Sequence, residues 1–205
     1  MLKFKIESGK IHITDPCYDT DTWCGIYNQT AKKGTWIGKI VSKEYEVDEL
    51  IVHHKDHPPT NDWRLLPGEV GVDSGQAGVF DANIYPKGGN NGEADDNTTF
   101  YGKCCRETCN GFDKEHQAKK KEMGLAESHG VVDGQGFVSH TAWGDGSYNA
   151  YAQYSGGVVV AVKIDYVGEE DEQFYCSECG MTEVDFDGEI CDECERENYE
   201  EEEND

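Results

Sequence analysis

Short apolar stretches, separated by glycine-rich turns, alternate with polar residues through most of the first 168 residues. A side-chain period of two is typical of β-strands, because successive side chains point to opposite faces of a sheet. The 24 glycines of the chain suit many short strands joined by tight turns. We therefore predict a mainly β fold, a sandwich or a partly closed barrel with one short helix. The predicted strands cover residues 3–7, 11–14, 36–41, 45–47, 69–73, 78–81, 130–132, 136–139, 148–154 and 158–164.

Turn residues between these stretches predict which strands pair. A Ser-Gly-Lys turn at residues 8–10 follows the first strand, so the first two strands are predicted to form a hairpin. Ser-Gly-Gln-Ala at residues 74–77 predicts a second strand–turn–strand unit. The run at residues 158–164 is apolar almost throughout, which indicates a central strand buried on both faces.

One segment favours a helix, at residues 113–127. Its three consecutive lysines, at residues 119–121, are expected on a solvated face. Met123 and Leu125 are weak apolar anchors for the opposite face.

The acidic charge is concentrated near the C-terminus. Residues 169–205 contain 18 acidic residues and one basic residue, a charge of −17, whereas residues 1–168 contain 24 acidic and 17 basic residues, a charge of −7. This change predicts a boundary near Gly168. We divide the chain into a β-rich main domain (1–168), a four-cysteine segment (169–197) and a disordered acidic tail (198–205).

Four of the nine cysteines have the spacing of a metal site: Cys176 and Cys179, then Cys191 and Cys194. Two Cys-x2-Cys pairs can complete a tetrahedral site of four thiolates, which suits Zn²⁺. Between the pairs, residues 183–190 have the pattern of a strand, an Asp-Gly turn and a returning strand. We predict a C-terminal zinc ribbon whose zinc is structural, since four cysteines leave no open position. Iron in a rubredoxin-like site, or four free cysteines in an acidic tail, are the alternatives.

The other five cysteines lack such regular spacing, and buried free thiols are the expected state. Cysteines 104, 105 and 109 could alternatively form part of a second metal site. Cysteine 17, close to Asp15, could alternatively be a nucleophile. The histidines at 53, 54 and 57 precede two prolines and are expected in a solvated loop. His140 is the histidine most suited to acid–base chemistry, because it lies near an Asp-Gly turn. The five cysteines are Cys17, Cys24, Cys104, Cys105 and Cys109.

Three segments place acidic and hydroxyl residues beside glycines at predicted strand ends. An aspartate there can bind a cation, act as a general base or hold a polar ligand, and glycine allows a ligand to approach the backbone. If the segments meet at one end of the sheet, Asp15, Asp73 and Asp145 form an acidic pocket. Ordinary turn chemistry, in which aspartate binds nearby backbone amides, is the alternative. The candidate ligand-binding residues are Asp15, Asp73, Ser74, Gln76, Asp81, Asp145 and Ser147.

Several classes of protein are not expected. No run of 18 apolar residues is present, which argues against a membrane protein, and the first residues lack the apolar region of a secretory signal. A net charge of −24 makes direct nucleic-acid binding unlikely, because phosphates are repelled. We expect a cytoplasmic protein whose partner is a small polar ligand or a protein with a basic surface.

Four motifs together resemble a family of uncharacterised proteins of tailed phages and some bacteria. They are the Asp-Pro-Cys-Tyr at residues 15–18 with the preceding strand, the Gly-Val-Asp-Ser-Gly-Gln-Ala-Gly-Val-Phe-Asp at 71–81, the Phe-Tyr-Gly-Lys-Cys-Cys at 100–105 and the Gly-Asp-Gly-Ser-Tyr at 144–148. The resemblance spans roughly residues 3–167, and the cysteine-rich segment is an addition to it. It implies a phage or bacterial cytoplasmic setting, and it implies no activity, substrate or catalytic residue.

Three functions remain open. The first is a binding protein whose main domain takes a small polar ligand or a host protein, in a phage setting to counter host defence. A nucleotide ligand would require a cation or nearby basic residues. The second is a metal-assisted hydrolase using the three aspartates of the acidic pocket, and the third is a virion or assembly component. The basic residues considered for a nucleotide are Arg64, Lys87, Lys103 and Arg106.

Overall fold

The structure is a computed structural model, and it describes residues 1–20, 22–88, 91–108, 113–168, 174–175, 177, 179 and 183–184. It divides into two compact units, Met1–Gly168 and Glu169–Asp205, and the boundary falls where the charge of the chain changes. Each unit is described by itself.

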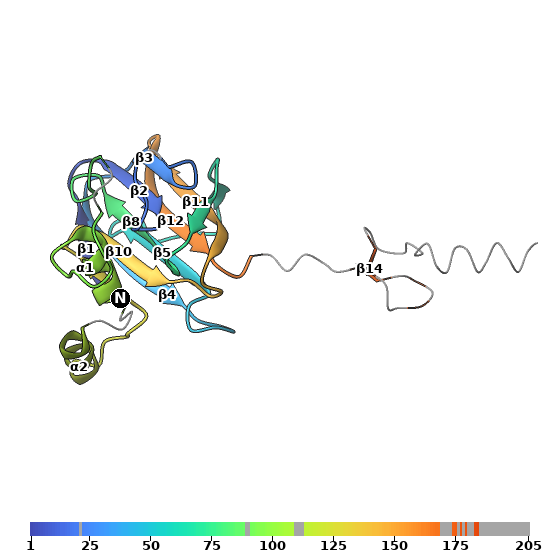
Figure 1. Cartoon of the computed structure of the whole chain (residues 1–205). Coiled ribbons are helices and arrows are strands. Elements are labelled where there is room, and N and C mark those ends of the chain that lie inside the picture. The colour runs from blue at the N-terminus through green and yellow to red at the C-terminus, as the bar shows by residue number, and fades with distance from the viewer. Residues whose placement is uncertain are drawn as a thin grey trace, which may run out of the picture. The chain divides into compact units, whose positions relative to one another are not determined.

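The first unit contains a larger sheet of seven strands (Figure 1). Six of them have the order β1-β4-β5-β12-β11-β6, and β7 also pairs with β11. The pairs along this sheet are antiparallel. The strands are β1 (Leu2–Ile6), β4 (Gly34–Val41), β5 (Glu49–His54), β6 (Arg64–Leu65), β7 (Val70–Val72), β11 (Gly146–Ser155) and β12 (Val158–Asp165).

A smaller sheet of five antiparallel strands has the order β3-β2-β8-β10-β9. Every residue of its central strand β8 is buried. Such burial indicates that both faces of the sheet are covered. The strands are β2 (Lys10–Thr14), β3 (Ile26–Thr30), β8 (Gln76–Asp81), β9 (His129–Val132) and β10 (Gly136–His140).

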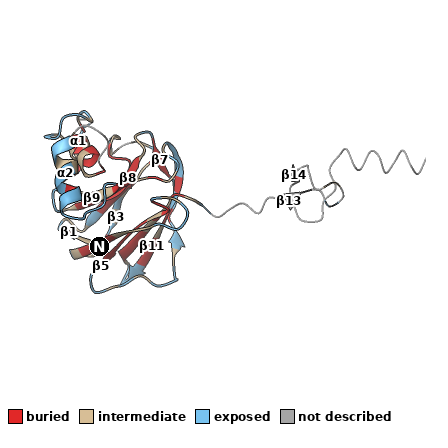
Figure 2. Cartoon of the chain, turned by 90° about the horizontal axis from the view of Figure 1, so that it is seen from below, coloured by how far each residue is buried: buried red, intermediate tan, exposed pale blue. Residues whose placement is uncertain are grey.

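One apolar core joins the two sheets. It contains Phe4 and Trp36 from the larger sheet and Ile13 and Phe137 from the smaller one. The rings of Phe4 and Phe137 stack with centroids 6.3 Å apart. Close approach is possible because residue 38 of β4 is glycine: a Cβ atom there would lie 2.5 Å from the Phe137 ring. Figure 2 shows the buried residues gathered within this unit.

Helix α1 (Phe100–Glu107) covers the outer face of the smaller sheet. Phe100 and Cys104 of the helix pack with Phe80 and Val138 of β8 and β10. Thr99 caps the helix, its hydroxyl accepting a hydrogen bond from the Gly102 backbone at 3.2 Å. Helix α1 was not predicted from the sequence, where one helix was expected, at residues 113–127.

The predicted helix at 113–127 is present as α2 (Lys114–Glu122), but its buried face was predicted wrongly. Met123 is 71% exposed, whereas Lys120 is only 4% exposed. The Lys120 ammonium donates to the backbone oxygens of Glu107 at 2.5 Å and His129 at 2.8 Å. The helix is therefore held by a buried lysine rather than by apolar anchors, and it lies farther from the sheets than α1 (Figure 1).

The strand pairing differs from the two predicted hairpins. β1 pairs with β4 and β2 pairs with β3 and β8, so these consecutive strands belong to different sheets. Likewise β7 pairs with β11 rather than with β8. Each short turn therefore carries the chain across the core, because each strand has its own apolar face to bury. Residues 45–47, predicted as a strand, form part of a loop.

Other predictions are confirmed. The protein is mainly β, and β12 is an interior strand between β5 and β11. β9 and β10, both predicted as strands, form an antiparallel pair. Within the described residues, neither sheet closes into a barrel, and no helix is long and apolar enough to cross a membrane.

In the second unit the structure describes one strand pair, β13 (Phe174–Tyr175) with β14 (Glu183–Val184). Of the four predicted zinc ligands, Cys179 is described, and Cys176, Cys191 and Cys194 lie outside the described residues. The acidic tail at 198–205 also lies outside them.

Candidate functional site

The structure distributes the seven predicted ligand-binding residues over three places. Four of them gather where β8 begins, at the end of β2 and in the β7–β8 turn. One is the last residue of β8, and two lie at the start of β11. In this order they are Asp15, Asp73, Ser74 and Gln76, then Asp81, then Asp145 and Ser147.

The carboxylate of Asp15 is fully buried and fixes the loops around it. Its Oδ1 accepts hydrogen bonds from the Cys17 backbone at 2.8 Å and from the Ser74 hydroxyl at 2.7 Å. Its Oδ2 accepts from the backbone of Asp73 at 2.9 Å and of Ser74 at 2.8 Å. We call this arrangement the Asp15 clamp. Four donors use most of the acceptor capacity of the carboxylate, so it has little left for a ligand or a metal.

A second buried carboxylate, that of Asp81, holds the turn between β1 and β2. It accepts hydrogen bonds from the backbone of Glu7, from the backbone of Ser8 at 2.9 Å and from the backbone of Asn83 at 2.7 Å. We call this arrangement the Asp81 clamp. It lies at the opposite end of β8 from Asp15, so the predicted set does not form one pocket.

Gln76 connects the sheet to α1 and is also fully buried. Its Oε1 accepts from the Thr108 hydroxyl at 2.7 Å, and its Nε2 donates to the sulfur of Cys105 at 3.3 Å. Burial raises the pKa of Tyr101, which lies on the same helix as Cys105. Gln76 therefore positions the helix beside the Asp15 clamp.

The thiols near the clamp are poor nucleophiles. Burial, and then the charge of Asp15, raise the pKa of Cys17 well above its ordinary value. Burial also raises the pKa values of Cys104 and Cys105. Since the thiolate is the reactive form, these cysteines stay protonated and unreactive at neutral pH.

Three of the predicted residues are exposed and close together: Asp73, Asp145 and Ser147. Gly146 pairs with Val72 and Ser147 with Gly71, which brings the start of β11 beside the β7–β8 turn. The Thr141 backbone also donates to the Gly75 oxygen at 3.1 Å. The predicted segments at residues 72–81 and 143–148 are therefore neighbours. The third segment contacts the first of these through the Asp15 carboxylate, which binds the backbone of Asp73 and Ser74.

Two exposed tryptophans belong to the loops next to these residues: Trp143 precedes Asp145 by two positions, and Trp23 precedes Cys24, which is hydrogen-bonded to the strand that leads to Asp73. Trp23 is 86% exposed and Trp143 is 59% exposed. The Cys24 oxygen accepts from the Gly71 backbone at 2.8 Å, and Gly71 pairs with Ser147. Two strand spacings, about 10 Å, therefore separate Cys24 from Ser147. The tryptophan face is defined as Trp23, Asp73, Trp143, Asp145 and Ser147.

Trp143 contacts Tyr45 from the β4–β5 loop. The two ring centroids are 4.4 Å apart and the ring planes meet at 57°. Trp23, Tyr45 and Trp143 were not among the residues predicted to bind a ligand. A signal was present, since Trp143 directly precedes the Gly-Asp-Gly turn at residues 144–146.

The histidines do not form a solvated loop as predicted. His53 and His54 are buried, on β5, and His57 is 2.6 Å from the Lys32 ammonium through its Nε2. Burial lowers the pKa of His140, which pairs with Gln76 across β10 and β8. Within the described part of the chain, no group of three or more His, Cys, Asp or Glu side chains comes together to hold a metal ion.

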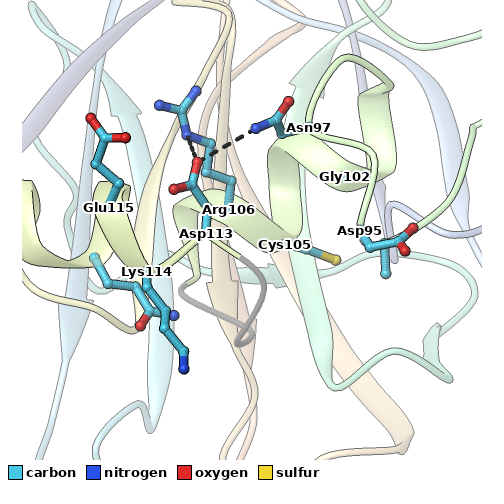
Figure 3. Close-up of a pocket in the computed structure, with 10 residues that line it drawn as sticks. Asp95, Asn97, Gly102, Cys105, Arg106, Asp113, Lys114 and Glu115 are labelled. Carbon is cyan, nitrogen blue, oxygen red and sulfur yellow. Dashed lines mark hydrogen bonds and ion pairs between the residues drawn. The ribbon is translucent and has the colours of Figure 1, made fainter.

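A cavity of about 330 Å³ lies between α1, the start of α2 and the loop before α1 (Figure 3). Asp113 lies between the two cavity residues that bind its carboxylate: Arg106 Nε at 3.1 Å and Asn97 Nδ2 at 3.5 Å. Lys103, on the same helix as Arg106, is paired with Asp133 at 2.8 Å. Arg106 and Lys103, two of the basic residues considered for a nucleotide, are therefore already paired with carboxylates.

Comparison with known proteins identifies no relative. No family model matches the chain, and no curated protein or solved structure matches it either.

Proposed function

We propose that the protein is a binding protein, and that its main domain engages a basic surface of a partner protein through the tryptophan face. One observation carries this proposal: two exposed tryptophans belong to loops that adjoin the exposed carboxylates of Asp73 and Asp145. Tryptophan is enriched among the residues that dominate binding energy at protein interfaces. Two largely solvent-exposed tryptophans on loops that adjoin the same carboxylates therefore indicate a binding surface.

The charge of this face selects the partner. Asp73 and Asp145 are exposed. The net charge of the chain, −24, adds a long-range attraction for cations. A partner with arginine or lysine at its contact surface complements both the local and the overall charge.

The same residues support catalysis less well. A hydrolase built on the three aspartates needs their carboxylates free for a metal or a substrate, but the Asp15 carboxylate already accepts four hydrogen bonds. The neighbouring Cys17 has a raised pKa and does not offer a thiolate. A binding role requires only the exposed members of the set.

The setting is proposed from the sequence resemblance. We infer a cytoplasmic protein of a phage or a bacterium, which in a phage would counter host defence by occupying a host protein. We also infer that the two sheets form a β-sandwich, because a single apolar core contains residues of both.

The function is tested by capturing partners from a bacterial extract with the full-length protein and with a Trp23→Ala/Trp143→Ala variant. A matched control replaces Glu200, Glu201, Glu202 and Glu203 with glutamine, which removes tail charge and leaves the tryptophan face intact. The captured protein is then purified and its affinity measured by calorimetry. We expect the double tryptophan variant to bind at least tenfold more weakly, and the tail variant to bind nearly as well as wild type.

The opposite pattern, loss with the tail variant and retention without the tryptophans, would show that the acidic tail attracts basic proteins and would refute the proposed face. Turnover of a phosphoester or peptide substrate that Asp73→Asn abolishes would favour the hydrolase. Sedimentation of the protein with phage particles would favour the assembly component.

For the second unit we propose a structural zinc bound by Cys176, Cys179, Cys191 and Cys194. β13 and β14 flank the first cysteine pair, as the hairpin of a zinc ribbon would. Native mass spectrometry of the protein as purified should find one zinc per chain. A Cys176→Ser/Cys191→Ser variant should contain none, and wild-type protein without zinc would refute the site.

A further inference from the structure

Two loops hold the aromatic rings of Tyr45 and Trp143 against each other at the surface. The rings are 4.4 Å apart between centroids and inclined by 57°, so they form a corner rather than a flat stack. Trp143 remains 59% exposed in this contact. We call this pair the Tyr45–Trp143 corner.

The loop that carries Trp143 is fixed by hydrogen bonds. The Thr141 hydroxyl donates to the Gly144 oxygen at 2.6 Å and accepts from the Gly144 backbone at 2.9 Å. The Tyr148 hydroxyl also donates to the Gly144 oxygen, at 2.9 Å. A ring held in this way loses little conformational entropy when a ligand binds to it.

The loop that carries Tyr45 is fixed by a buried carboxylate. Asp48 accepts hydrogen bonds from the backbone of Lys43 at 2.5 Å, of Glu44 at 3.3 Å and of Tyr45 at 3.2 Å. These backbone donors lower the pKa of Asp48, so it is ionised at neutral pH. Both rings of the corner are therefore presented by ordered backbone.

The charges around the corner are mainly negative. Glu44 and Glu46 are exposed on the tyrosine loop, and Asp145 is exposed on the tryptophan loop. Lys43 is also on the tyrosine loop, and its ammonium pairs with Glu49 at 3.5 Å. An aromatic corner with carboxylates on both of its loops suits a cation. The ring faces are electron-rich, and the carboxylates neutralise the charge of the cation.

We propose that the Tyr45–Trp143 corner binds an arginine side chain of the partner protein. This inference rests on the proposed function and names the group that the tryptophan face recognises. A guanidinium is planar and weakly hydrated, so it can stack on one ring while its N–H groups donate to a neighbouring carboxylate. Lysine has a compact, strongly hydrated charge and fits the corner less well.

The test is an NMR titration of the full-length protein, with the indole N–H signals of its tryptophans labelled with ¹⁵N. The probe is the capped tripeptide Gly-Arg-Gly, and the matched control is Gly-citrulline-Gly, which has the same shape without the charge. The Trp143 signal is assigned by its loss in Trp143→Ala. We expect the arginine peptide to move this signal in a saturable way, and the citrulline peptide to move it much less.

Variants then locate the site. We expect Trp143→Ala to weaken binding, followed through backbone amide signals, about threefold to fivefold, the range of a cation–π contact at an exposed site. Trp143→Phe should keep most of the affinity. Tyr154→Ala is the matched control, since it removes an aromatic ring that is 42% exposed and lies outside both the corner and the tryptophan face, and it should change the affinity less than twofold.

Equal shifts with the citrulline peptide, or an unchanged affinity in Trp143→Ala, would overturn the inference. An equal loss in Tyr154→Ala would also overturn it, because binding would then not be centred on the corner. These failures are distinct from a failure of the proposed function, which is measured by partner affinity in the double tryptophan variant. The tail variant with glutamine at residues 200–203 should bind the peptide as wild type does, which excludes attraction by the tail.

Discussion

The two ends of β8 have the same buried hydrogen-bonding arrangement but different exposed residues. At each end a fully buried aspartate binds backbone amides of neighbouring loops, in the Asp15 clamp and in the Asp81 clamp. Above the Asp15 clamp lie exposed tryptophans and carboxylates, whereas the Asp81 clamp holds the turn of Ser8, Gly9 and Lys10. A buried aspartate at a strand end therefore indicates an ordered loop, and the exposed side chains on that loop indicate what it does.

The largest effect is expected at the Asp15 clamp. Asp15→Ala leaves three backbone amides and the Ser74 hydroxyl without their acceptor, in a fully buried place. Each unsatisfied buried group costs about 1–3 kcal/mol, part of which water entry recovers. We expect a loss of about 3–5 kcal/mol in the free energy of unfolding, measured by denaturant titration of the full chain.

The Asp81 clamp sharpens the comparison. Asp81→Ala removes the acceptor of three backbone amides, and two of them, at Glu7 and Ser8, belong to a turn at the surface. We expect a loss of about 2–4 kcal/mol, smaller than at Asp15 because water reaches this turn more easily. A change below about 0.5 kcal/mol in Asp15→Ala would show that its carboxylate is not structural and would return it to the list of ligand-binding residues.

A pH effect is expected from the strand between the clamps. His12, on β2, is buried beside Tyr27 and Tyr85, and burial lowers its pKa to about 4. The unfolded chain, with a histidine pKa of about 6.5, binds the proton more readily. The stability from neutral His12 is therefore complete above about pH 6.5 and is lost as the pH falls towards 4, by on the order of 3 kcal/mol.

The measurement is the free energy of unfolding of wild type and of His12→Gln at several pH values between 7 and 4. The variant cannot titrate at this position, so its stability should fall less steeply. Burial also lowers the pKa of His129 to about 4, so part of the acid sensitivity remains in the variant. Parallel curves would show that His12 titrates normally in the folded protein.

A smaller effect on the free energy of unfolding is expected at Gln76, the first residue of β8, which contacts α1. Gln76→Met removes the acceptor of the Thr108 hydroxyl and the donor to Cys105, and it keeps a similar volume. We expect a loss of about 1 kcal/mol, the net contribution of a buried hydrogen bond, because the Thr108 hydroxyl can still donate to the backbone oxygens of Cys104 at 3.2 Å and Cys105 at 3.3 Å. Amide hydrogen exchange should become faster in α1 and stay unchanged in β12. Faster exchange throughout the domain would contradict a local role for Gln76.

Much of the fold was predictable because it depends on local periodicity. The alternation at 148–154 and the apolar run at 158–164 are present as β11 and β12, which pair in the larger sheet. The pairing of β1 with β4 was not predictable, because a short glycine turn permits both a hairpin and a crossing between sheets. Which one forms depends on long-range burial that no local pattern contains.

The helices show a second limit. Helix α1 contains Gly102 and two cysteines, which are weak helix formers, and the reason is tertiary: a Cβ at residue 102 would lie 2.0 Å from the Asp96 oxygen. The buried Lys120 was missed because a lysine between two lysines is normally solvated. The candidate site shows the same limit. Its aspartates were identified from the sequence, but whether an aspartate is buried in a clamp or exposed for binding depends on the fold.

The smallest effects on stability are expected on the tryptophan face, and they separate function from structure. Asp145 is exposed, and Trp143 is more than half exposed, so Asp145→Asn and Trp143→Ala remove little buried surface. We expect Asp145→Asn to change the free energy of unfolding by less than about 0.5 kcal/mol, and Trp143→Ala by about 1 kcal/mol through its contact with Tyr45. Both should nevertheless weaken partner binding. A loss above about 3 kcal/mol in the free energy of unfolding of Trp143→Ala would show that its ring stabilises the fold. The exposed residues at this end of β8 would then have a structural role, as the Asp81 clamp has at the other end.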